Sequence, residues 1–262
     1  MNETQQTTSL LTLAIDIGGS HLKAAALNAA GAMAGEAVRV ETPRPATPKS
    51  VVAALTGLVK PLDHFDRVSI GFPGVLKGGM VLTAPTLEAK GWHGFDLGAA
   101  MKERLGRPVR LLNDASVQGL GVIDGRGLEC VLTMGTGMGF ALFQDGRLAP
   151  HLEMSQHPVR KDWTYNEYVG HAALEAIGKR HWNRRMRRVM DILETVVNYD
   201  MLYIGGGNAR LIPTPLPEHV KIVPNAAGIT GGVRLWDERL DDYFAEAAAP
   251  FVPAPRIEPG AE

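Results

Sequence analysis

The sequence lacks the residues that would mark a disulfide-bonded, metal-caged or membrane-spanning protein. Its 262 residues include one cysteine, Cys130, so neither an intrachain disulfide nor a cysteine-based zinc cage can form. No apolar run approaches the roughly 20 residues that cross a bilayer, and residues 1–9 are polar, without the basic start of a signal peptide. These absences predict a cytoplasmic protein with no structural zinc and no membrane partner.

The chain also lacks an excess of charge of either sign. It has 27 Lys and Arg against 28 Asp and Glu, so its formal net charge is -1. No whole-chain field attracts nucleic acid, and we expect no nucleic-acid partner. The hydrophobic share of 45% and the charged share of 21% are those of a globular protein. The length allows one large domain or two smaller lobes.

Short apolar segments alternate with amphipathic ones, which is typical of an α/β protein. Strands are predicted over residues 11–17, 22–27, 37–41, 68–71, 109–112, 129–134, 140–144 and 201–204. Helices are predicted over residues 51–59, 96–105, 115–122 and 186–197, and a last helix over 226–235. We expect Ser50 to cap the first helix, Asp145-Gly146 to form a hairpin turn, and residues 247–262 to be a poorly ordered tail.

Three glycine turns follow apolar strands, and they are the strongest functional signal. They are Gly18-Gly19-Ser20, with Lys23 close behind, Gly135-Thr136-Gly137 and Gly205-Gly206-Gly207. Without Cβ atoms, the backbone amides of such turns can approach phosphate oxygens. A single turn of this kind is a weak signal and is more often only a turn, but three at strand ends favour a phosphate-binding site. Neither the P-loop pattern nor the Rossmann glycine pattern is present.

Two acidic residues stand where chemistry is expected. Asp114 ends a predicted strand, beside Asn113, at the position where ligand sites of α/β proteins gather. It suits the carboxylate that orients an attacking hydroxyl in phosphoryl transfer. An Asx turn or a helix cap explains the same Asn-Asp pair equally well. Asp16, inside an apolar strand, either bonds a neighbouring loop or holds a hydrated cation.

Five motifs occur in a fixed order, namely Asp16-Ile17-Gly18-Gly19-Ser20 through Lys23, Gly71-Phe72-Pro73-Gly74, Leu112-Asn113-Asp114-Ala115, Thr133-Met134-Gly135-Thr136-Gly137-Met138-Gly139 and Ile204-Gly205-Gly206-Gly207. Through them the sequence resembles the ROK (repressor, ORF, kinase) family of sugar kinases over about residues 11–235. Phe140-Ala141-Leu142-Phe143 and Asn225-Ala226-Ala227-Gly228-Ile229 are most similar to the polyphosphate glucokinase branch. The resemblance implies an α/β, actin-like and ribonuclease-H-like fold of two lobes with a cleft between them.

The resemblance also implies roles for residues. Asp114 would be the general base, and Asp16 would help to place Mg²⁺ through water. The phosphoryl donor, ATP or inorganic polyphosphate, would be bound by Gly18, Gly19, Ser20, Lys23, Gly135, Thr136, Gly137, Gly205, Gly206 and Gly207. The sugar would meet Gly74, Asn113, Asp114, Glu153, Gln156 and Glu167. A homodimer is expected from the family.

The sugar motif departs from the family pattern. Gln156 stands at the histidine position of Glu153-Met154-Ser155-Gln156, and a neutral amide cannot titrate. His157 could replace the missing ring only if the loop slips by one residue. Thr86 stands where relatives often carry asparagine. The identity of the sugar therefore stays open.

A basic cluster spans residues 179–188, where six of ten residues are Lys or Arg. Arg180, Arg184 and Arg188 share one helical face, since they are spaced four apart. The cluster is either the solvated face of an amphipathic helix or a stripe that binds a linear polyanion such as polyphosphate.

The motifs together predict a hexokinase-type phosphotransferase that moves a phosphoryl group from ATP or polyphosphate to a hexose hydroxyl. A non-catalytic sugar or phosphate sensor on the same fold is the alternative, because the sugar motif is altered. A third possibility is a polyanion-binding protein that uses the basic cluster. The N-terminal lobe is expected to comprise residues 1–115 and 232–262, with a returning C-terminal helix, and the C-terminal lobe residues 116–231.

Overall fold

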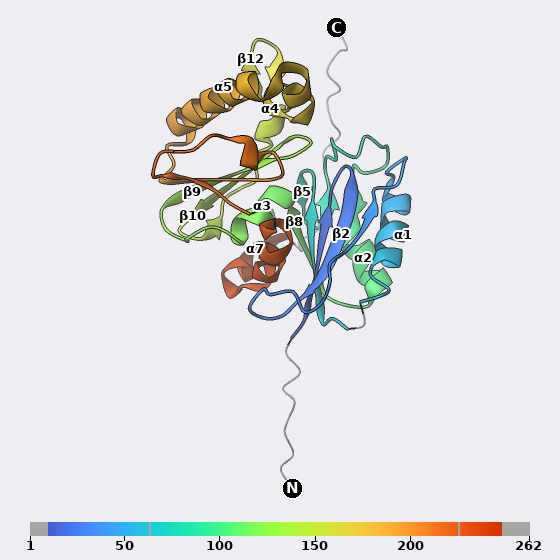
Figure 1. The fold of residues 1–262 in the computed structure, drawn as a ribbon. Coiled ribbons are helices and arrows are strands. Elements are labelled where there is room, and N and C mark those ends of the chain that lie inside the picture. The colour runs from blue at the N-terminus through green and yellow to red at the C-terminus, as the bar shows by residue number, and fades with distance from the viewer. Residues whose placement is uncertain (1–9, 63, 225, 248–262) are drawn as a thin grey trace.

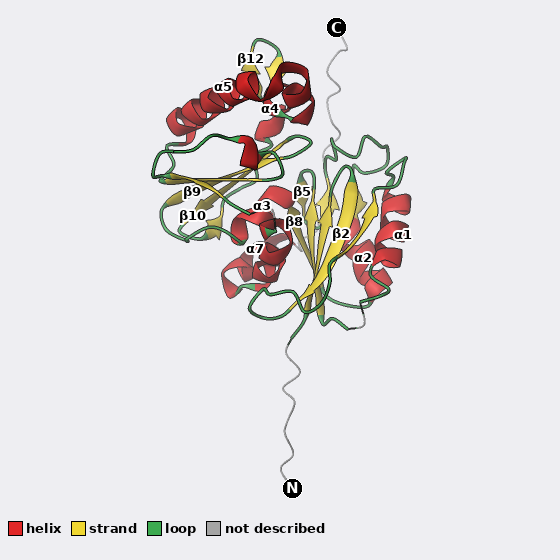
Figure 2. Cartoon of the chain, viewed as in Figure 1, coloured by secondary structure: helices red, strands yellow, loops and turns green. Residues whose placement is uncertain are grey.

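The computed structural model describes residues 10–62, 64–224 and 226–247. Its helices and strands form two lobes, each built on its own five-stranded sheet (Figures 1 and 2). Asn225 and residues 248–262, which carry part of the branch resemblance and most of the predicted tail, lie outside the described residues. In the part of the chain that is described, no helix is long and apolar enough to cross a membrane.

The first sheet has the strand order β3-β2-β1-β4-β8. Its strands are β1 (Thr12–Ile17), β2 (His21–Leu27), β3 (Val38–Glu41), β4 (Arg67–Phe72) and β8 (Val109–Asn113). The first three form an antiparallel meander, as predicted, whereas β1, β4 and β8 run parallel. Because β1, β4 and β8 run in the same direction, the residues that follow them meet at one edge of the sheet.

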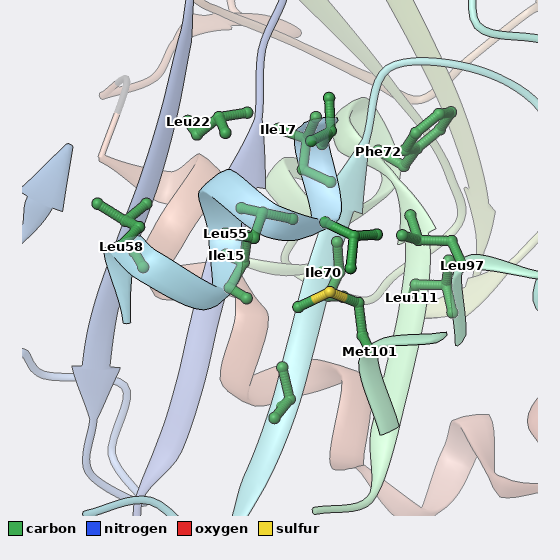
Figure 3. Packing of buried hydrophobic residues seen from close by; sticks show 14 of the residues in the cluster. Ile15, Ile17, Leu22, Leu55, Leu58, Ile70, Phe72, Leu97, Met101 and Leu111 are labelled. Atoms are coloured by element: carbon green, nitrogen blue, oxygen red, sulfur yellow. The ribbon is translucent and has the colours of Figure 1, made fainter. Parts of the chain in front are cut away.

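Helices α1 (Pro48–Leu58) and α2 (Leu97–Leu105) cover one face of the first sheet (Figure 1). Figure 3 shows Leu55 and Leu58 of α1 and Met101 of α2 packed against strand residues such as Ile15 and Ile70. These side chains are less than a tenth exposed. This core fixes β1 and β4, whose ends carry the motif residues. Beside it lies a small sheet of β5 (Leu76–Lys77), β6 (Met80–Val81) and β7 (Phe95–Asp96).

The second sheet has the order β11-β10-β9-β14-β15. Its strands are β9 (Leu128–Met134), β10 (Met138–Gln144), β11 (Arg147–Leu148), β14 (Met201–Gly205) and β15 (Val220–Ile222). Helices α4 (Tyr165–Val169) and α5 (His171–Val197) pack over it, and a hairpin of β12 (Pro158–Arg160) and β13 (Trp163–Thr164) precedes them. Cys130 is a fully buried thiol on β9.

Helix α3 (Asp114–Leu120) follows β8 and lies between the two sheets (Figure 1). Helix α6 (Ala227–Thr230) and the 3₁₀ helix Gly231–Trp236 pack against it, and the chain then ends its described part in α7 (Asp241–Ala247). The Ser69 hydroxyl of β4 donates to the Gly232 carbonyl at 2.7 Å, which ties this returning segment to the first sheet. The predicted residue ranges of the two lobes stay a prediction.

Three helix predictions need correction. Thr47, not Ser50, caps α1, because its hydroxyl accepts from the Ser50 amide at 3.2 Å. Residues 226–235 do not form one helix but α6 and a 3₁₀ helix, and Gly232 of the latter packs so close to β1 that a Cβ there would be 2.8 Å from the Ala14 Cβ. Helix α5 begins at His171, far ahead of the predicted start, and is interrupted at Gly178, whose φ is 74°.

Candidate active site

A cleft of about 300 Å³ lies between the two sheets and is lined by residues of both lobes. The first lobe contributes the β1–β2 turn, the loop after β4 and the junction of β8 with α3. The second lobe contributes the β9–β10 turn, the loop after β10 and the end of β14. All three predicted glycine turns and both predicted acidic residues therefore border one cavity.

The β1–β2 turn is a tight backbone loop. The Gly18 amide donates to the His21 carbonyl at 3.0 Å, and a Cβ on Gly19 would lie 3.0 Å from the Thr86 carbonyl. A Cβ on Gly18 would lie 2.9 Å from the His21 carbonyl oxygen, closer than real side chains approach, and both glycines line the cleft. Ser20 is exposed and does not line it.

Asp16 and Lys23 form an ion pair across β1 and β2, with Lys23 Nζ 3.1 Å from Asp16 Oδ2. Both line the cleft. Burial raises the pKa of Asp16 above its usual value, although Lys23 opposes this. Asp16 thus bonds a lysine on the neighbouring strand β2 rather than a loop, and it also borders the cavity.

The β9–β10 turn is held by two asparagines. Asn166 of α4 accepts from the Met138 amide at 2.7 Å, and Asn208 donates to the Gly135 carbonyl at 3.2 Å. Gly135, Thr136 and Gly137 line the cleft. This turn faces the β1–β2 turn across the cavity, so backbone of both lobes surrounds the same space.

The glycines at the end of β14 have different roles. Gly206 has φ of 86°, and a Cβ there would overlap the Met134 backbone. Gly206 and Gly207 line the cleft. Gly205 lies beneath them, where a Cβ would collide with the side-chain amide of Gln118.

Asn113 and Asp114 occupy the junction of β8 and α3. Asn113 caps α3 by accepting from the Ala115 amide at 3.0 Å, and its own amide donates to the Gly74 carbonyl at 3.2 Å. The cap predicted as an alternative is thus real, and Asn113, Asp114 and Gly74 also line the cleft. Asp114 Oδ1 accepts from the Ala115 amide at 2.8 Å.

The electrostatic environment of Asp114 makes its proton affinity unusual. Burial raises the pKa of Asp114 to about 7, and the neighbouring Asp16 carboxylate adds to this effect. The Ala115 amide opposes the shift, and Glu153 supports it. Asp114 can therefore accept and release a proton near neutral pH.

Glu153 is held in its ionised form by two neighbours. Its Oε1 accepts a short hydrogen bond from the Ser155 hydroxyl, and its Oε2 lies 3.4 Å from His151 Nε2. Burial alone would raise the pKa of Glu153, but hydrogen bonds from His151 and then Ser155 outweigh it and hold the pKa below its usual value. Two carboxylates with opposite pKa shifts thus border one cleft, an arrangement suited to one proton acceptor and one permanently charged ligand.

Two predicted sugar ligands do not line the cleft. Gln156 is exposed, and its amide donates to the Ser155 hydroxyl at 3.3 Å. Glu167 is exposed because it closes a capping box with Thr164 at the start of α4. The one-residue slip does not occur either, since His157 is exposed and its ring faces Tyr165, 6.3 Å away between centroids.

Three residues that line the cleft were not predicted as site residues from the sequence: Gln118, Ser155 and Asn166. Gln118 lies four residues after Asp114 on α3, a spacing that places both side chains on one helical face. Asn166 lies one position before Glu167, the residue to which the resemblance assigned a sugar contact. Ser155 lies inside the sugar motif, between Glu153 and Gln156, the two positions to which the resemblance assigns sugar contacts.

The basic residues Arg180, Arg184 and Arg188 are exposed along α5. Within residues 10–62, 64–224 and 226–247, none of these three makes an ion pair. Arg185, between them, instead stacks on Trp163 and Tyr168.

The acidic residues of the cleft suit a metal that arrives with its ligand. Among the described residues, no three His, Cys, Asp or Glu side chains gather to hold a metal ion. Mg²⁺ usually takes one or two carboxylates, water and substrate phosphates rather than a complete protein cage. Asp16, beside the β1–β2 turn, fits that pattern.

The two lobes, the glycine turns and the cleft define the actin-like class of phosphate-binding folds, and comparison with known proteins narrows it. A model of the ROK family matches residues 12–150, more than half of the chain. The chain is 29% identical over 247 residues to polyphosphate glucokinase from Mycobacterium tuberculosis (strain CDC 1551 / Oshkosh), covering 83% of this chain and 88% of that relative. The protein therefore belongs to the ROK family.

Two solved structures confirm the predicted fold. The inorganic polyphosphate/ATP-glucomannokinase from Arthrobacter sp. strain KM superposes with a TM-score of 0.78 and 30% identity, over 86% of this chain and 97% of that one. A ROK family glucokinase from Streptomyces griseus, solved with glucose and AMPPNP, superposes with a TM-score of 0.70 over 86% and 98% of the two chains. Its identity of 19% supports the fold alone.

Proposed function

We propose that this protein is a hexose kinase that transfers a phosphoryl group from Mg-ATP or Mg-polyphosphate to a sugar hydroxyl. The observation that carries the proposal is that Asp114 and Glu153 line the same cleft as residues of the three glycine turns. The names of the Mycobacterium tuberculosis and Arthrobacter relatives support it, since both describe glucose-phosphorylating enzymes that use polyphosphate.

Asp114 would accept the proton of the attacking hydroxyl. A general base works best when its pKa is near the working pH, and burial raises the pKa of Asp114 to about 7. Glu153, held ionised, would accept a hydrogen bond from a second sugar hydroxyl. The Asn113 amide and the Gly74 backbone would complete the sugar side of the cleft.

The donor would lie between the glycine turns of the two lobes. Gly18, Gly19 and Lys23 would bind the transferred phosphoryl group, with Gly135, Thr136 and Gly137 opposite them. Asp16 would hold Mg²⁺ through water, and the metal would neutralise charge on the donor phosphates when bound. Gly206 and Gly207 would contact the remainder of the donor.

We further propose that the protein acts as a homodimer in the cytoplasm, with lobes of residues 1–115 plus 232–262 and residues 116–231. The size of the particle in solution tests the first point. Arg180, Arg184 and Arg188 would guide long polyphosphate chains to the enzyme, because they are exposed and unpaired within the described residues.

A non-catalytic sensor remains the second candidate, and one observation favours it. The Gln156 side chain lies outside the cleft, so the motif supplies Glu153 and Ser155 but no titratable ring. A sensor would bind sugar without consuming donor. Calorimetry alongside a donor-consumption assay separates the two functions.

The proposal is tested with Asp114→Asn, which preserves shape and the acceptor for the Ala115 amide but removes the base. Sugar-dependent ADP release should fall by about 10²-fold or more, while the calorimetric affinity for sugar stays close to that of the unaltered protein. Asp145→Asn, an exposed turn residue, is the matched control and should keep full turnover. If Asp114→Asn retained most of its activity, Asp114 would not be the base.

A further inference from the structure

Gln118 has a buried amide that the fold leaves without a partner. The side chain is 4% exposed, and its Nε2 has no hydrogen-bond acceptor among the described residues. Buried amide groups are normally satisfied, so such an atom calls for an explanation, a missing ligand among them. Gln118 lines the cleft, and the cleft is the side from which a ligand can supply an acceptor.

The position of Gln118 identifies the part of the cleft it serves. It lies one helical turn beyond Asp114, on the same face of α3, and both side chains line the cleft. Its Nε2 contacts Gly205, the first glycine of the turn whose other two glycines line the cleft. The proposed sugar side, where the Asn113 amide donates to the Gly74 carbonyl, lies at the N-terminus of α3, before Asp114.

The surroundings also specify the kind of acceptor. A methyl group of Val223 lies beside the same glycine, Gly205, and cannot accept a hydrogen bond. The terminal torsion of glutamine is broad, so the amide can turn toward the cavity at little cost. An acceptor-only oxyanion, such as a phosphate oxygen, matches a side chain that offers two N–H groups.

We propose that Gln118 is a donor-binding residue: its amide donates a hydrogen bond to a phosphate oxygen of the bound phosphoryl donor, beside the Gly205-Gly206-Gly207 turn. This inference rests on the proposed function and adds the Gln118 side chain to a proposed donor site formed by the glycine turns, Thr136 and Lys23. A hydrogen bond to a charged acceptor is stronger than a neutral one, so this contact distinguishes a phosphate from an uncharged ligand.

A purely structural role of Gln118 would lead to different experimental results. If Gln118 only supported Gly205, a residue of similar shape would serve as well, and any loss on substitution would appear in the melting temperature. If it binds the donor, Gln118→Met removes the contact while filling the same space. The melting temperature should then stay unchanged or rise, since an unsatisfied buried amide has been removed.

The test measures binding of Mg-tripolyphosphate by calorimetry, which needs no turnover, and the KM values for Mg-ATP and for sugar. Gln118→Met should weaken tripolyphosphate binding and raise the KM for ATP by about 10-fold or more, with the sugar KM unchanged. Gln118→Glu keeps the shape but adds a repelling charge, and should weaken binding further. Gln144→Met, the same change at an exposed strand end, is the matched control and should bind as the unaltered protein does.

The inference would be overturned if both Gln118 variants bound tripolyphosphate as tightly as the unaltered protein does. It would also be overturned if the affinity for sugar, the affinity for donor and the melting temperature all fell together. Should Gln118→Met fail to fold, Gln118→Glu decides the matter alone. An unaltered protein that binds tripolyphosphate but phosphorylates no sugar would refute the proposed function and not this contact. An active protein whose Gln118 variants match it would refute only the contact.

Discussion

Replacing the proposed base should stabilise the protein while inactivating it. Asp114 ionises with a pKa of about 7 in the folded protein, against 3.8 for an unperturbed aspartate. The folded state therefore holds its proton more tightly than the unfolded state does. The contribution of the Asp114 proton to the free energy of unfolding is fully present below pH 3.8. It is lost as the pH rises toward 7, and it does not change further above that pH. Asp114→Asn has no charge to bury and escapes this loss.

The magnitude follows from the pKa difference. Each pKa unit is worth about 1.4 kcal/mol, so a pKa raised by about three corresponds to roughly 4 kcal/mol at pH 8. At pH 5 the loss of stability from ionising Asp114 is only about 1.5 kcal/mol. The free energy of unfolding of Asp114→Asn should thus exceed that of the unaltered protein by an amount that grows by roughly 2 to 3 kcal/mol between pH 5 and pH 8.

Urea denaturation followed by tryptophan fluorescence at pH 5, 6.5 and 8 measures this difference. Asp145→Asn is the control, because hydrogen bonds from Gln144 and from the Gly127 amide lower the pKa of Asp145. The Asp145 carboxylate therefore contributes stability above its pKa, and this contribution is lost as the pH falls. Asp145→Asn should thus be no more stable than the unaltered protein at pH 8. An Asp114→Asn protein that is less stable at pH 8, or whose advantage does not change with pH, would refute the reasoning.

Three further predictions concern the rate, the donor turn and the basic stripe. Turnover should rise about tenfold per pH unit below pH 7 and level off above it, because only the ionised Asp114 accepts a proton; a flat profile of kcat from pH 5.5 to 8 would contradict this. Gly206→Ala should cost about 1–2 kcal/mol of stability or more, since φ is 86° there and a Cβ would overlap the Met134 backbone. Gly207→Ala is the control: its Cβ would have open space around it, so the variant should unfold at the same urea concentration as the unaltered protein. Replacing Arg184 and Arg188 together by glutamine should raise the KM for long polyphosphate several-fold at low salt and leave the KM for ATP unchanged; equal changes for both donors would show that the stripe is only a solvated face.

Much of the fold could be predicted because local signals agree with tertiary structure. The meander of β1 to β3, the strands that carry the glycine turns and the Asp145-Gly146 hairpin all follow from apolar runs and turn residues. Strand β15 was missed, since its three residues have no periodicity to read. The early start of α5 was missed because the segment before Met186 is dominated by charged and small residues, and packing of Trp182 stabilises it.

The candidate site divides in a similar way. Asp16, Lys23 and Asp114 line the cleft as the motifs indicate, because Asp114 directly follows β8 and Asp16 and Lys23 are paired on β1 and β2 beside their turn. Gln156 and Glu167 do not, since a 3₁₀ turn and a capping box direct their side chains to solvent. Such local geometry depends on loop conformations that one sequence does not reveal. Gln118 could have been found, because its spacing from Asp114 on a helix was visible.

The central claim is that this cleft phosphorylates a sugar through Asp114. The most direct measurement is a panel of glucose, mannose, fructose, glucosamine and N-acetylmannosamine, each assayed with Mg-ATP and with Mg-polyphosphate, with Asp114→Asn run in parallel. The account predicts sugar-dependent turnover with at least one pair and a loss of about 10²-fold or more in the variant. A folded protein that binds a sugar yet consumes neither donor across the panel would contradict the claim and favour the sensor.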